Sequence, residues 1–324
     1  MADCKVSVVC LTYNHRDYIR ECLDGFVKQK TTFPFRVVVH DDASTDGTAE
    51  IVREYAERYP DIITPILQSE NQWSKGKTLS KTFIYPVLRG EYVAFCEGDD
   101  YWTDENKLQK QVDFLDSHPD FSICFHAVQV YWQETGLSYE VFPSRALCFN
   151  KDVLTLDDLL KHNFIQPNGV LLRWRFYRDS YDLIPDKILP GDWFLFLLHA
   201  ELGKIKFMPE VMGVYRRHPQ GIWYEVRRSQ RWFERKAPFM LRFFQAMQDR
   251  YGYEQISDIV LMKYGNRLAV EDCDGTSVLR TLNRFILMVF ALACVPFAFT
   301  RRQKRIWYNY GKALYLSIRW TFQK

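Results

Sequence analysis

The chain has 324 residues, of which 47% are hydrophobic and 26% charged; this composition excludes a disordered protein, because enough apolar surface is available to bury a large core. The net charge of +3 hides an asymmetry, since all 40 acidic residues lie at or before Asp274 and residues 275–324 carry nine Lys or Arg and no acid. A basic surface confined to that segment, beside an acidic remainder, argues against a nucleic-acid partner.

The eight cysteines indicate a reducing compartment. They are scattered, without a C-x-x-C pair or the spacing of a zinc finger, and several lie in apolar runs where a thiol behaves as a small hydrophobic side chain. The segment Met1–Lys5 leads directly into an apolar run and lacks the charged and apolar regions of a signal peptide. We therefore expect a cytoplasmic protein.

The first third of the chain alternates predicted strands and helices. Continuous apolar runs predict strands at Val6–Leu11, Arg36–His40 and Ile62–Leu67. Between them, apolar residues at three- and four-residue spacing predict helices near Tyr18–Val27 and Ile51–Tyr59. This order of near-continuous apolar strands indicates an α/β fold with a parallel sheet covered by helices, and ligands of such sheets bind beyond the carboxyl ends of the strands.

A group of carboxylates follows the next predicted strand. The strand Glu91–Phe95 leads into Glu97, Asp99 and Asp100. Carboxylates so close together repel one another unless a cation or several donors neutralise them, and hard oxygen ligands suit Mg²⁺ or Mn²⁺. The alternative is an acidic turn that caps the helix predicted at 104–118. Because polar turns after the first two strands fall at the same edge of the sheet, the position favours a metal site.

The rest of the chain is less regular. The expected elements are a strand at Phe121–Val128, mostly loops over 131–165 with a helix near Leu156–Lys161, a break at Gln166–Gly169, a strand at Val170–Arg173, an apolar helix at Trp193–Leu202 and, after Pro209, a strand at Val211–Arg217.

Five segments in order carry a resemblance to a known family. They are Val6–His15, Asp41–Thr48, Arg89–Asp100, Gly191–Trp193 and Tyr215–His218. Together they resemble the signature of family 2 glycosyltransferases with the GT-A fold. The resemblance implies an inverting, metal-dependent transfer of a sugar from a nucleotide-diphosphate sugar to a glycan or lipid-linked acceptor, as in the synthesis of bacterial capsule and lipopolysaccharide. The resemblance covers roughly residues 5–220, and we expect a catalytic domain over residues 1–225, followed by a helical region over 226–324.

The resemblance implies roles for the residues around the nucleotide. Asp42 matches the position that reads the nucleobase, and a carboxylate can accept the imide N–H of uracil or thymine, so a UDP- or dTDP-sugar is favoured. Thr12, Tyr13 and Asn14 match the turn that lines the same pocket, with an ordinary turn between strand and helix as the alternative. Lys81 stands where the family often has an arginine, and it either binds phosphate or pairs with an acid.

The acidic group after the fourth predicted strand matches the D-x-D motif of the family. Glu97 replaces the usual first Asp and is expected to hold the ribose, while Asp99 is expected to bind Mn²⁺ or Mg²⁺, with Asp100 as a second ligand. The later segment Arg216–His218 resembles the element that closes over the diphosphate.

Within that later segment, Arg217 is expected to bind the nucleotide and His218 the metal, although a lone histidine is more often structural.

An inverting transfer needs a base that takes the proton of the acceptor hydroxyl. By resemblance Asp192 is the candidate, although the family commonly has an acidic pair here and this chain has Gly191 before it. The alternative for Asp192 is a helix N-cap. Gln166, Asn168 and Trp193 are placed by their positions as acceptor-binding residues, with core packing as the alternative for the tryptophan.

The segment 281–324 has a composition suited to a membrane surface. Phe285–Phe299 is an unbroken apolar run of 15 residues, followed by the basic segment Arg301–Arg305 and by aromatic residues mixed with cations. A spanning helix needs about 20 apolar residues, so the run fits an interfacial anchor, peripheral on the cytosolic face of the inner membrane. The alternative is a pair of helices that packs on the catalytic domain or on a second subunit.

Two other functions stay open at this point. A sugar nucleotidyltransferase can share a similar sheet and metal site, but the basic, glycine-rich phosphate loop that it would need after the first strand is missing from the sequence. A catalytically silent nucleotide-binding or scaffold protein is suggested by the missing acid before Asp192.

Overall fold

The computed structural model describes residues 4–176, 181–224 and 230–252. The chain divides into two compact units, Met1–Phe243 and Phe244–Lys324. The first unit contains every predicted site residue, and the fold described below is that of this unit. The predicted membrane-associating segment 281–324 lies outside the described residues, and the boundary predicted at residue 225 stays a prediction.

The elements follow one another along the chain as follows. The strands are β1 (Val6–Thr12), β2 (Phe35–Asp41), β3 (Ile63–Leu67), β4 (Tyr92–Phe95), β5 (Tyr101–Trp102), β6 (Phe121–Trp132), β7 (Leu137–Phe142), β8 (Val153–Leu154), β9 (Val170–Arg173) and β10 (Lys204–Arg217). The α-helices are α1 (Ile19–Val27), α2 (Thr48–Arg58), α3 (Lys107–Ser117), α4 (Leu156–Lys161), α5 (Gly191–Ala200) and α6 (Gln230–Tyr251). Three short helices of other types are η1 (Ser80–Ile84), η2 (Tyr85–Val87) and η3 (Pro167–Gly169).

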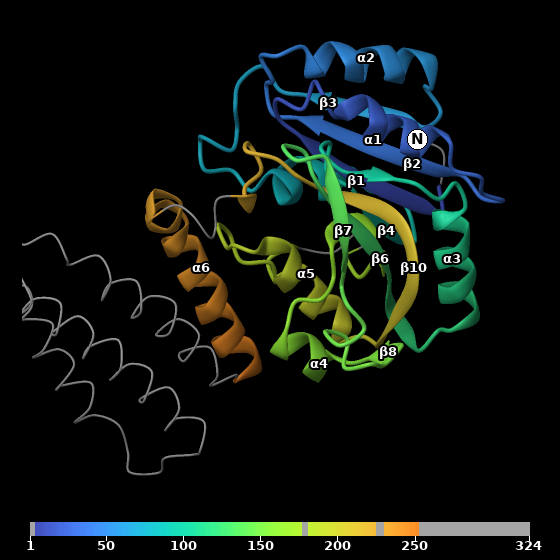
Figure 1. Ribbon diagram of the computed structural model, residues 1–324, viewed down its shortest axis with the longest axis vertical. Coiled ribbons are helices and arrows are strands. Elements are labelled where there is room, and N and C mark those ends of the chain that lie inside the picture. The colour runs from blue at the N-terminus through green and yellow to red at the C-terminus, as the bar shows by residue number, and fades with distance from the viewer. Residues whose placement is uncertain (1–3, 177–180, 225–229, 253–324) are drawn as a thin grey trace, which may run out of the picture. The chain divides into compact units, whose positions relative to one another are not determined.

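All ten strands belong to one sheet, in the order β3-β2-β1-β4-β9-β6-β10-β5, with β7 beside β6 and β8 beside β10 (Figure 1). The pairs β3–β2, β2–β1, β1–β4 and β6–β10 are parallel. Strand β9 runs antiparallel between β4 and β6. The predicted α/β architecture with a mostly parallel sheet is confirmed.

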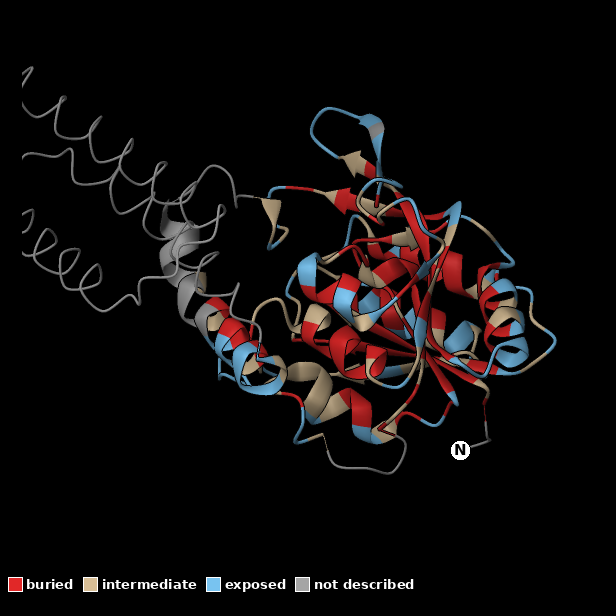
Figure 2. Cartoon of the chain, turned by 90° about the horizontal axis from the view of Figure 1, so that it is seen from below, coloured by how far each residue is buried: buried red, intermediate tan, exposed pale blue. Residues whose placement is uncertain are grey.

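The strands are apolar because the sheet is buried on both faces. Val8 and Val9 of β1 point to opposite faces, and their side chains are 0% and 3% exposed. One face packs against the apolar sides of α1, α2 and α3, for example through Phe26, Val52 and Leu108. Helix α5 packs against β6 with buried residues outside that cluster. Figure 2 shows buried residues concentrated in the strands and on the inner sides of these helices.

Two predictions about strands were wrong. Strand β7 lies in the segment predicted as loop; its residues mix polar and apolar side chains, and they pair only with the C-terminal part of β6, Val128–Trp132. Strand β10 begins at Lys204, well before Pro209. The missing N–H of the proline is accommodated because the pairing of β10 with β6 shifts register between Met208 and Val211.

Lys107, at the start of α3, is a fully buried lysine in the core. Its ammonium group lies 3.9 Å from the ring centroid of Trp102, and among the described residues its Nζ has no hydrogen-bond partner. Burial lowers the pKa of Lys107 to about 7. The contact with the indole face offsets only part of the desolvation cost of the charged form.

We expect Lys107→Met to raise the free energy of unfolding at pH 7 by about 2–4 kcal/mol, because it removes a poorly compensated buried amine at similar volume. Between pH 7 and pH 10 the unfolded chain binds the Lys107 proton and the folded chain does not, so wild-type stability rises with pH and the advantage of the variant shrinks. Urea unfolding at both pH values measures this. Equal stability of the two proteins at pH 7 would contradict the prediction.

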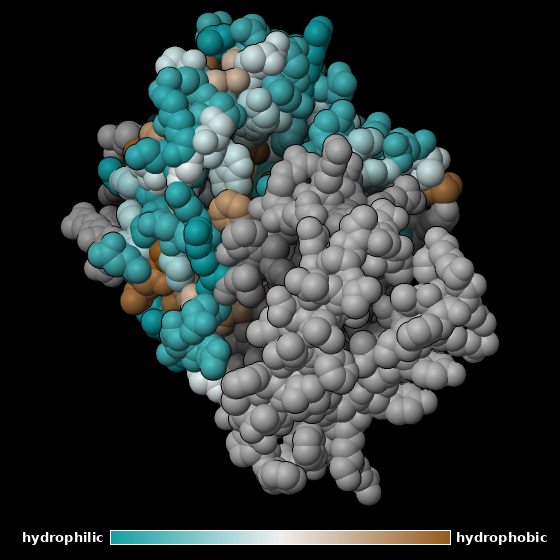
Figure 3. All heavy atoms as spheres, turned by 90° about the vertical axis from the view of Figure 1, so that its left-hand side faces the viewer, coloured by the Kyte–Doolittle hydropathy of each residue, from teal (hydrophilic) through white to brown (hydrophobic). Residues whose placement is uncertain are grey.

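The face drawn in Figure 3 presents mostly hydrophilic side chains of described residues, interrupted by small hydrophobic groups. Such scattered apolar side chains are ordinary on folded proteins. Within the described ranges, no helix is both long and apolar enough to cross a lipid bilayer.

Candidate active site

Three polar loops meet at the carboxyl ends of β1, β2 and β4. Strand β1 lies between β2 and β4, and both pairs are parallel. The loops are joined by backbone hydrogen bonds, since the amide of Asp42 donates to the carbonyl of Thr12 and the amide of Gly98 donates to the carbonyl of Leu11. The parallel register therefore brings polar turns that are far apart in the sequence to one edge of the sheet.

Gly98 allows the acidic loop, Glu97–Asp100 after β4, to lie against β1. A Cβ atom at this position would be 2.7 Å from Oγ1 of Thr12 and 3.0 Å from Cδ1 of Ile19. These contacts are shorter than van der Waals distances, so a side chain would push Glu97 and Asp99 away from the β1 turn. The close approach explains why a glycine separates the two acids.

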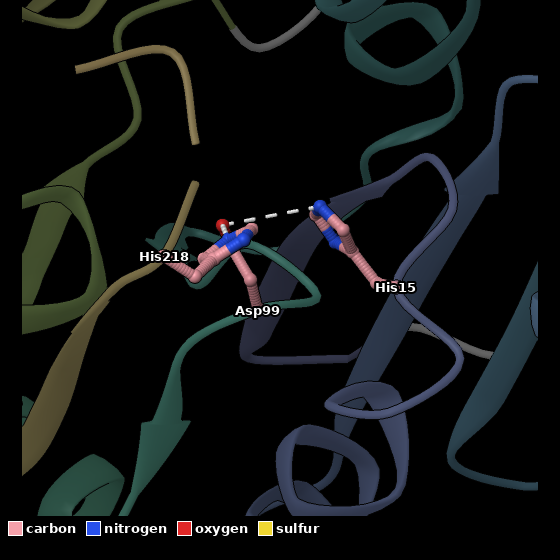
Figure 4. A group of neighbouring side chains, drawn as sticks. All are labelled: His15, Asp99 and His218. Atoms are coloured by element: carbon pink, nitrogen blue, oxygen red, sulfur yellow. Dashed lines mark hydrogen bonds and ion pairs between the residues drawn. The ribbon is translucent and has the colours of Figure 1, made fainter. Parts of the chain in front are cut away.

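His15, Asp99 and His218 form the group that could hold a metal ion within the described part of the chain, with ligand atoms within 4.8 Å of one another. Figure 4 shows the three side chains pointing toward one another from three separate segments. Nε2 of His218 lies 2.9 Å from Oδ2 of Asp99, and Nε2 of His15 lies 3.9 Å from the same oxygen. Among the described residues, Oδ1 of Asp99 is buried without a hydrogen-bond partner.

The three side chains shift one another's pKa values. Burial alone would raise the pKa of Asp99, but the imidazoles of His15 and His218 hold it below its ordinary range. Burial lowers the pKa of His15, against the opposing charge of Asp99. Burial would also lower the pKa of His218, but its hydrogen bond to Asp99 raises it. An ionised carboxylate beside two imidazoles is a suitable ligand set for a divalent metal.

The predicted ligand Asp100 lies outside this group. Its buried carboxylate accepts a hydrogen bond of 2.8 Å from the backbone N–H of Arg216. Burial and the neighbouring Asp99 raise the pKa of Asp100 well above its ordinary value. The structure therefore places Asp100 as a tether between the acidic loop and β10.

Arg216 makes the same connection with its side chain. Its Nε donates to the carbonyl of Asp99 at 2.9 Å, its Nη1 donates to Oε1 of Gln133 at 2.6 Å, and its Nη2 pairs with Glu21. The guanidinium also lies over the rings of Tyr18, Tyr101 and Tyr131. With all these contacts the buried Arg216 supports the site from behind, which differs from the expectation that the whole Arg216–His218 segment closes over a diphosphate.

Asp192 and Glu97 bring two further carboxylates to this edge. Glu97 is exposed, but partial loss of hydration, together with the charges of Asp99 and Asp192, raises its pKa. Asp192 lies in the first turn of α5, and the N-cap position itself is held by Pro190. Partial burial raises the pKa of Asp192 to about 6, against the opposing effect of the backbone N–H groups of Trp193 and Asp192.

The residues predicted to bind the nucleobase surround the first two loops. The buried carboxylate of Asp42 accepts hydrogen bonds from the amides of Gln72 and Trp73 at 2.8 and 3.0 Å. It thereby fixes the loop after β3, and each oxygen retains a lone pair for a further donor. Thr12 is buried, whereas Tyr13 is 46% exposed.

Asn14 connects the same two loops. It has a positive φ of 55°, its backbone N–H donates to Oγ of Ser44, and its Oδ1 accepts from the amide of Thr45. The turn after β1 is therefore held in one conformation by the loop after β2.

The two predicted cationic residues lie in different surroundings. Nζ of Lys81 lies 3.4 Å from the carboxylate of Asp186 and donates to the carbonyl of Ile184. The contact with Asp186 corresponds to the second of the two roles considered for Lys81, pairing with an acid. Arg217 is partly buried and lies over the rings of Trp132 and Tyr215.

The residues predicted to bind the acceptor have mainly structural contacts. Asn168 is fully buried, and its side-chain Nδ2 donates to the carbonyl of Val214. The backbone carbonyl of Asn168 accepts a hydrogen bond from the indole N–H of Trp102. Trp193 donates to the carbonyl of Leu159. Gln166 is partly buried and precedes η3.

Two residues of this site were missed by sequence reasoning. His15 is a single histidine in a polar turn, and nothing in its neighbours distinguishes it from a solvated residue. Arg216 was grouped with Arg217, although alternation along β10 places the two side chains on opposite faces of the strand. That alternation was the one signal in the sequence that could have separated them.

Comparisons with known proteins agree with this architecture. Residues 7–173, just over half of the chain, match the family described as Glycosyl transferase family 2. An uncharacterised protein of Mycobacterium tuberculosis is 44% identical over 257 residues, covering 79% of this chain and 71% of its own. TuaG from Bacillus subtilis, a protein assigned to teichuronic acid biosynthesis as a glycosyltransferase, is 29% identical over 49% of this chain and 58% of its own.

Solved structures share the fold. TarS residues 1–349 from S. aureus, crystallised with UDP-GlcNAc, has a TM-score of 0.57 and 22% identity over 86% of this chain and 77% of its own. The mannosyltransferase PcManGT from Pyrobaculum calidifontis, in complex with GDP-Man and Mn²⁺, has a TM-score of 0.50 and 18% identity over 98% of this chain and 87% of its own. The expected GT-A fold is thus confirmed, and the chain belongs to glycosyl transferase family 2.

Proposed function

We propose that this glycosyltransferase is an inverting, metal-dependent enzyme that moves a sugar from a UDP- or dTDP-sugar to a hydroxyl of a glycan or lipid-linked acceptor. The observation that carries the proposal is the meeting of a metal-capable group around Asp99 with the carboxylates of Glu97 and Asp192 at one edge of the sheet. The group around Asp99 suits a cation that would bind a diphosphate, and Asp192 would provide the base.

A divalent ion fits the residues present. Asp99 has a buried oxygen with no partner among the described residues, and the nitrogen of His218 faces the same carboxylate. We propose that Asp99 and His218 hold Mn²⁺ or Mg²⁺. When bound, the ion would stabilise negative charge on the departing nucleoside diphosphate.

Asp192 is proposed as the base. It takes the proton of the acceptor hydroxyl, the hydroxyl oxygen forms a bond to the anomeric carbon, and the bond from that carbon to the diphosphate oxygen breaks. The carboxylate lies in the first turn of α5, where the helix N-terminus favours the ionised form. With a pKa of about 6, Asp192 is ionised at neutral pH and is a stronger base than an ordinary aspartate.

The preference for a uracil or thymine nucleotide rests on Asp42. Its oxygens already accept two amide donors, which hold the carboxylate in place. The lone pairs that remain can accept one imide N–H of the base. A base without that donor forgoes a hydrogen bond to a charged group, which is worth about 1.5–3 kcal/mol.

A role in cell-surface polysaccharide synthesis is proposed from the relatives. TuaG is assigned to teichuronic acid biosynthesis, and a Bacillus spizizenii relative, 33% identical over 32% of this chain and 16% of its own, is a poly(ribitol-phosphate) beta-glucosyltransferase. We propose that the basic, apolar segment 281–324 holds the enzyme on the cytosolic face of the membrane, where a lipid-linked acceptor would lie.

Calorimetric titration of UDP, dTDP, GDP and CDP, with and without Mn²⁺, tests the donor site. We expect one uracil or thymine nucleotide to bind in a metal-dependent manner, and Asp99→Ala to weaken this binding at least about 100-fold because it removes the central ligand. Binding of no nucleotide under either condition would contradict the proposed function. Pyrophosphate-dependent exchange of the bound nucleotide would instead indicate a nucleotidyltransferase.

The pH profile tests the base. We expect kcat/KM for the acceptor, measured at saturating donor and Mn²⁺, to fall about tenfold from pH 7 to pH 5, because a carboxyl group with a pKa of about 6 becomes protonated over this range. Donor binding is measured at the same pH values as a control. Unchanged donor binding would assign the fall in activity to protonation of Asp192, and weaker donor binding would assign it to loss of the metal. A profile that stays flat down to pH 5 would contradict the assignment of Asp192.

A further inference from the structure

The turn after β1 brings an unassigned histidine to the proposed metal site. The imidazole of His15 is mostly buried, with 16% of its side chain exposed. Among the described residues its Nδ1 is buried without a hydrogen-bond partner, while its Nε2 faces Asp99 at 3.9 Å. Burying an imidazole with so few partners costs free energy unless another ligand completes its contacts.

The distances within the group match those between ligands of a shared ion. Nitrogen and oxygen ligands bind divalent transition metals at about 2.0–2.2 Å, so two ligands of one ion lie about 3–4 Å apart. The separations from Oδ2 of Asp99 are 2.9 Å to His218 and 3.9 Å to His15. The two imidazole rings approach edge to face at an interplanar angle of 87°, so they do not stack and their nitrogens can converge.

A hydrogen bond from outside the group orients His218. Its Nδ1 lies 3.0 Å from Oε1 of Gln220, an oxygen that can only accept, so Nδ1 carries a proton. Its other ring nitrogen, Nε2, then faces Oδ2 of Asp99 at 2.9 Å, so this nitrogen and the carboxylate oxygen point to the same place. An outer hydrogen bond of this kind, at the ring nitrogen that does not face the ion, is typical of metal-bound histidines.

We infer that His15 is a third protein ligand, so that His15, Asp99 and His218 form a two-histidine, one-carboxylate site that selects Mn²⁺ or another transition metal over Mg²⁺. Imidazole nitrogen suits transition metals, whereas Mg²⁺ prefers oxygen ligands and retains its waters. The inference rests on the proposed function for the existence of the metal site, and it adds a ligand and a metal preference. A bound metal would also tie the turn that carries Thr12 to Asn14 to the acidic loop.

The side chain of His15 can be changed without releasing the turn. Its backbone N–H donates to Oγ1 of Thr48 at 2.9 Å, and its carbonyl accepts from the amides of Tyr18 and Ile19. These contacts are independent of the imidazole. His15→Ala and His15→Asp are therefore expected to fold like the wild type, which circular dichroism and urea unfolding check.

The test is Mn²⁺ binding by the purified full chain, alone and with UDP, followed by electron paramagnetic resonance, with Mg²⁺ as competitor. We expect pulsed spectra to show two coordinated nitrogens in the wild type and one in His15→Ala, and the variant to bind Mn²⁺ about 10- to 100-fold more weakly. Affinity for Mg²⁺ should change less than the Mn²⁺ affinity. His15→Asp should narrow the preference for Mn²⁺ by supplying oxygen, and the exposed His118→Gln should match the wild type.

The outcomes separate this inference from the proposed function. One coordinated nitrogen in the wild type, with unchanged Mn²⁺ affinity in His15→Ala, would overturn the role of His15 and leave Asp99 and His218 as ligands. No Mn²⁺ binding, alone or with UDP, would overturn the metal site as a whole. Sugar transfer in the presence of a chelator would then show that the transferase activity stands without it.

Discussion

Asp192→Asn is expected to lower kcat for sugar transfer about 10²–10⁴-fold, the range that a general base contributes. The amide is nearly isosteric with the carboxylate but cannot accept the proton of the acceptor hydroxyl. Asp192 lies at the start of α5 and is not a member of the group His15, Asp99 and His218. Donor affinity should therefore stay within a few-fold of the wild type, which places the loss in the chemical step.

The neighbouring position offers a matched control for this variant. A Cβ atom added at Gly191 would meet no atom within 4 Å among the described residues, so Gly191→Ala should fold normally and keep the carboxylate of Asp192 in place. Steady-state kinetics of both variants, with calorimetric donor binding, makes the comparison. Equal activity of Asp192→Asn and Gly191→Ala would remove Asp192 from the reaction and give weight to the catalytically silent alternative.

Arg216→Met is expected to destabilise the fold by about 3 kcal/mol and to disorganise the metal site. The side chain is 5% exposed and joins the acidic loop, Gln133 and Glu21. Removing the guanidinium leaves the buried carbonyl of Asp99 without its donor, which costs about 1–3 kcal/mol, and it also ends the contacts with Gln133 and Glu21. Because methionine keeps much of the volume, a cavity contributes little to the loss.

Arg20→Met is the control for this prediction. Arg20 pairs with Glu54 through two hydrogen bonds on the exposed surface of α1 and α2, where solvent screens the pair, so a much smaller change in stability is expected. Urea unfolding gives the stability of each variant, and Mn²⁺ titration gives the state of the site. A stability of Arg216→Met equal to that of Arg20→Met would contradict the central position assigned to Arg216.

The acidic loop shows how much of the site can be predicted from the sequence. The apolar runs before Glu97 and before Asp42 identify strands, and since parallel strands end at one edge, their polar turns could be expected together. The sequence also marks Gly98 as the gap between two acids. It does not reveal that a Cβ atom at this position would lie 2.7 Å from Oγ1 of Thr12, because that distance depends on how β4 lies against β1.

For residues whose side chains could serve two purposes, packing in the folded protein decides which role is possible. The sequence allows Asn168 to face an acceptor, but its side chain is fully buried and donates to the carbonyl of Val214 in β10. It allows Lys107 to be an ordinary first-turn lysine of a helix, whereas the fold buries the amine on Trp102. The sequence is the same whether these side chains are exposed or buried, so the periodicity of apolar residues cannot distinguish the two positions.

By itself the sequence determined the α/β class, the edge of the sheet that carries the site, and the family, because these depend on local apolar periodicity and on motifs within single segments. Only the tertiary structure brought His15 to Asp99 and His218, placed Arg216 behind them and moved Asp100 away from the metal-capable group. The physical reason is that a ligand set is defined by distances between atoms on separate loops. Those distances are set by strand register and side-chain packing, which no single stretch of sequence contains.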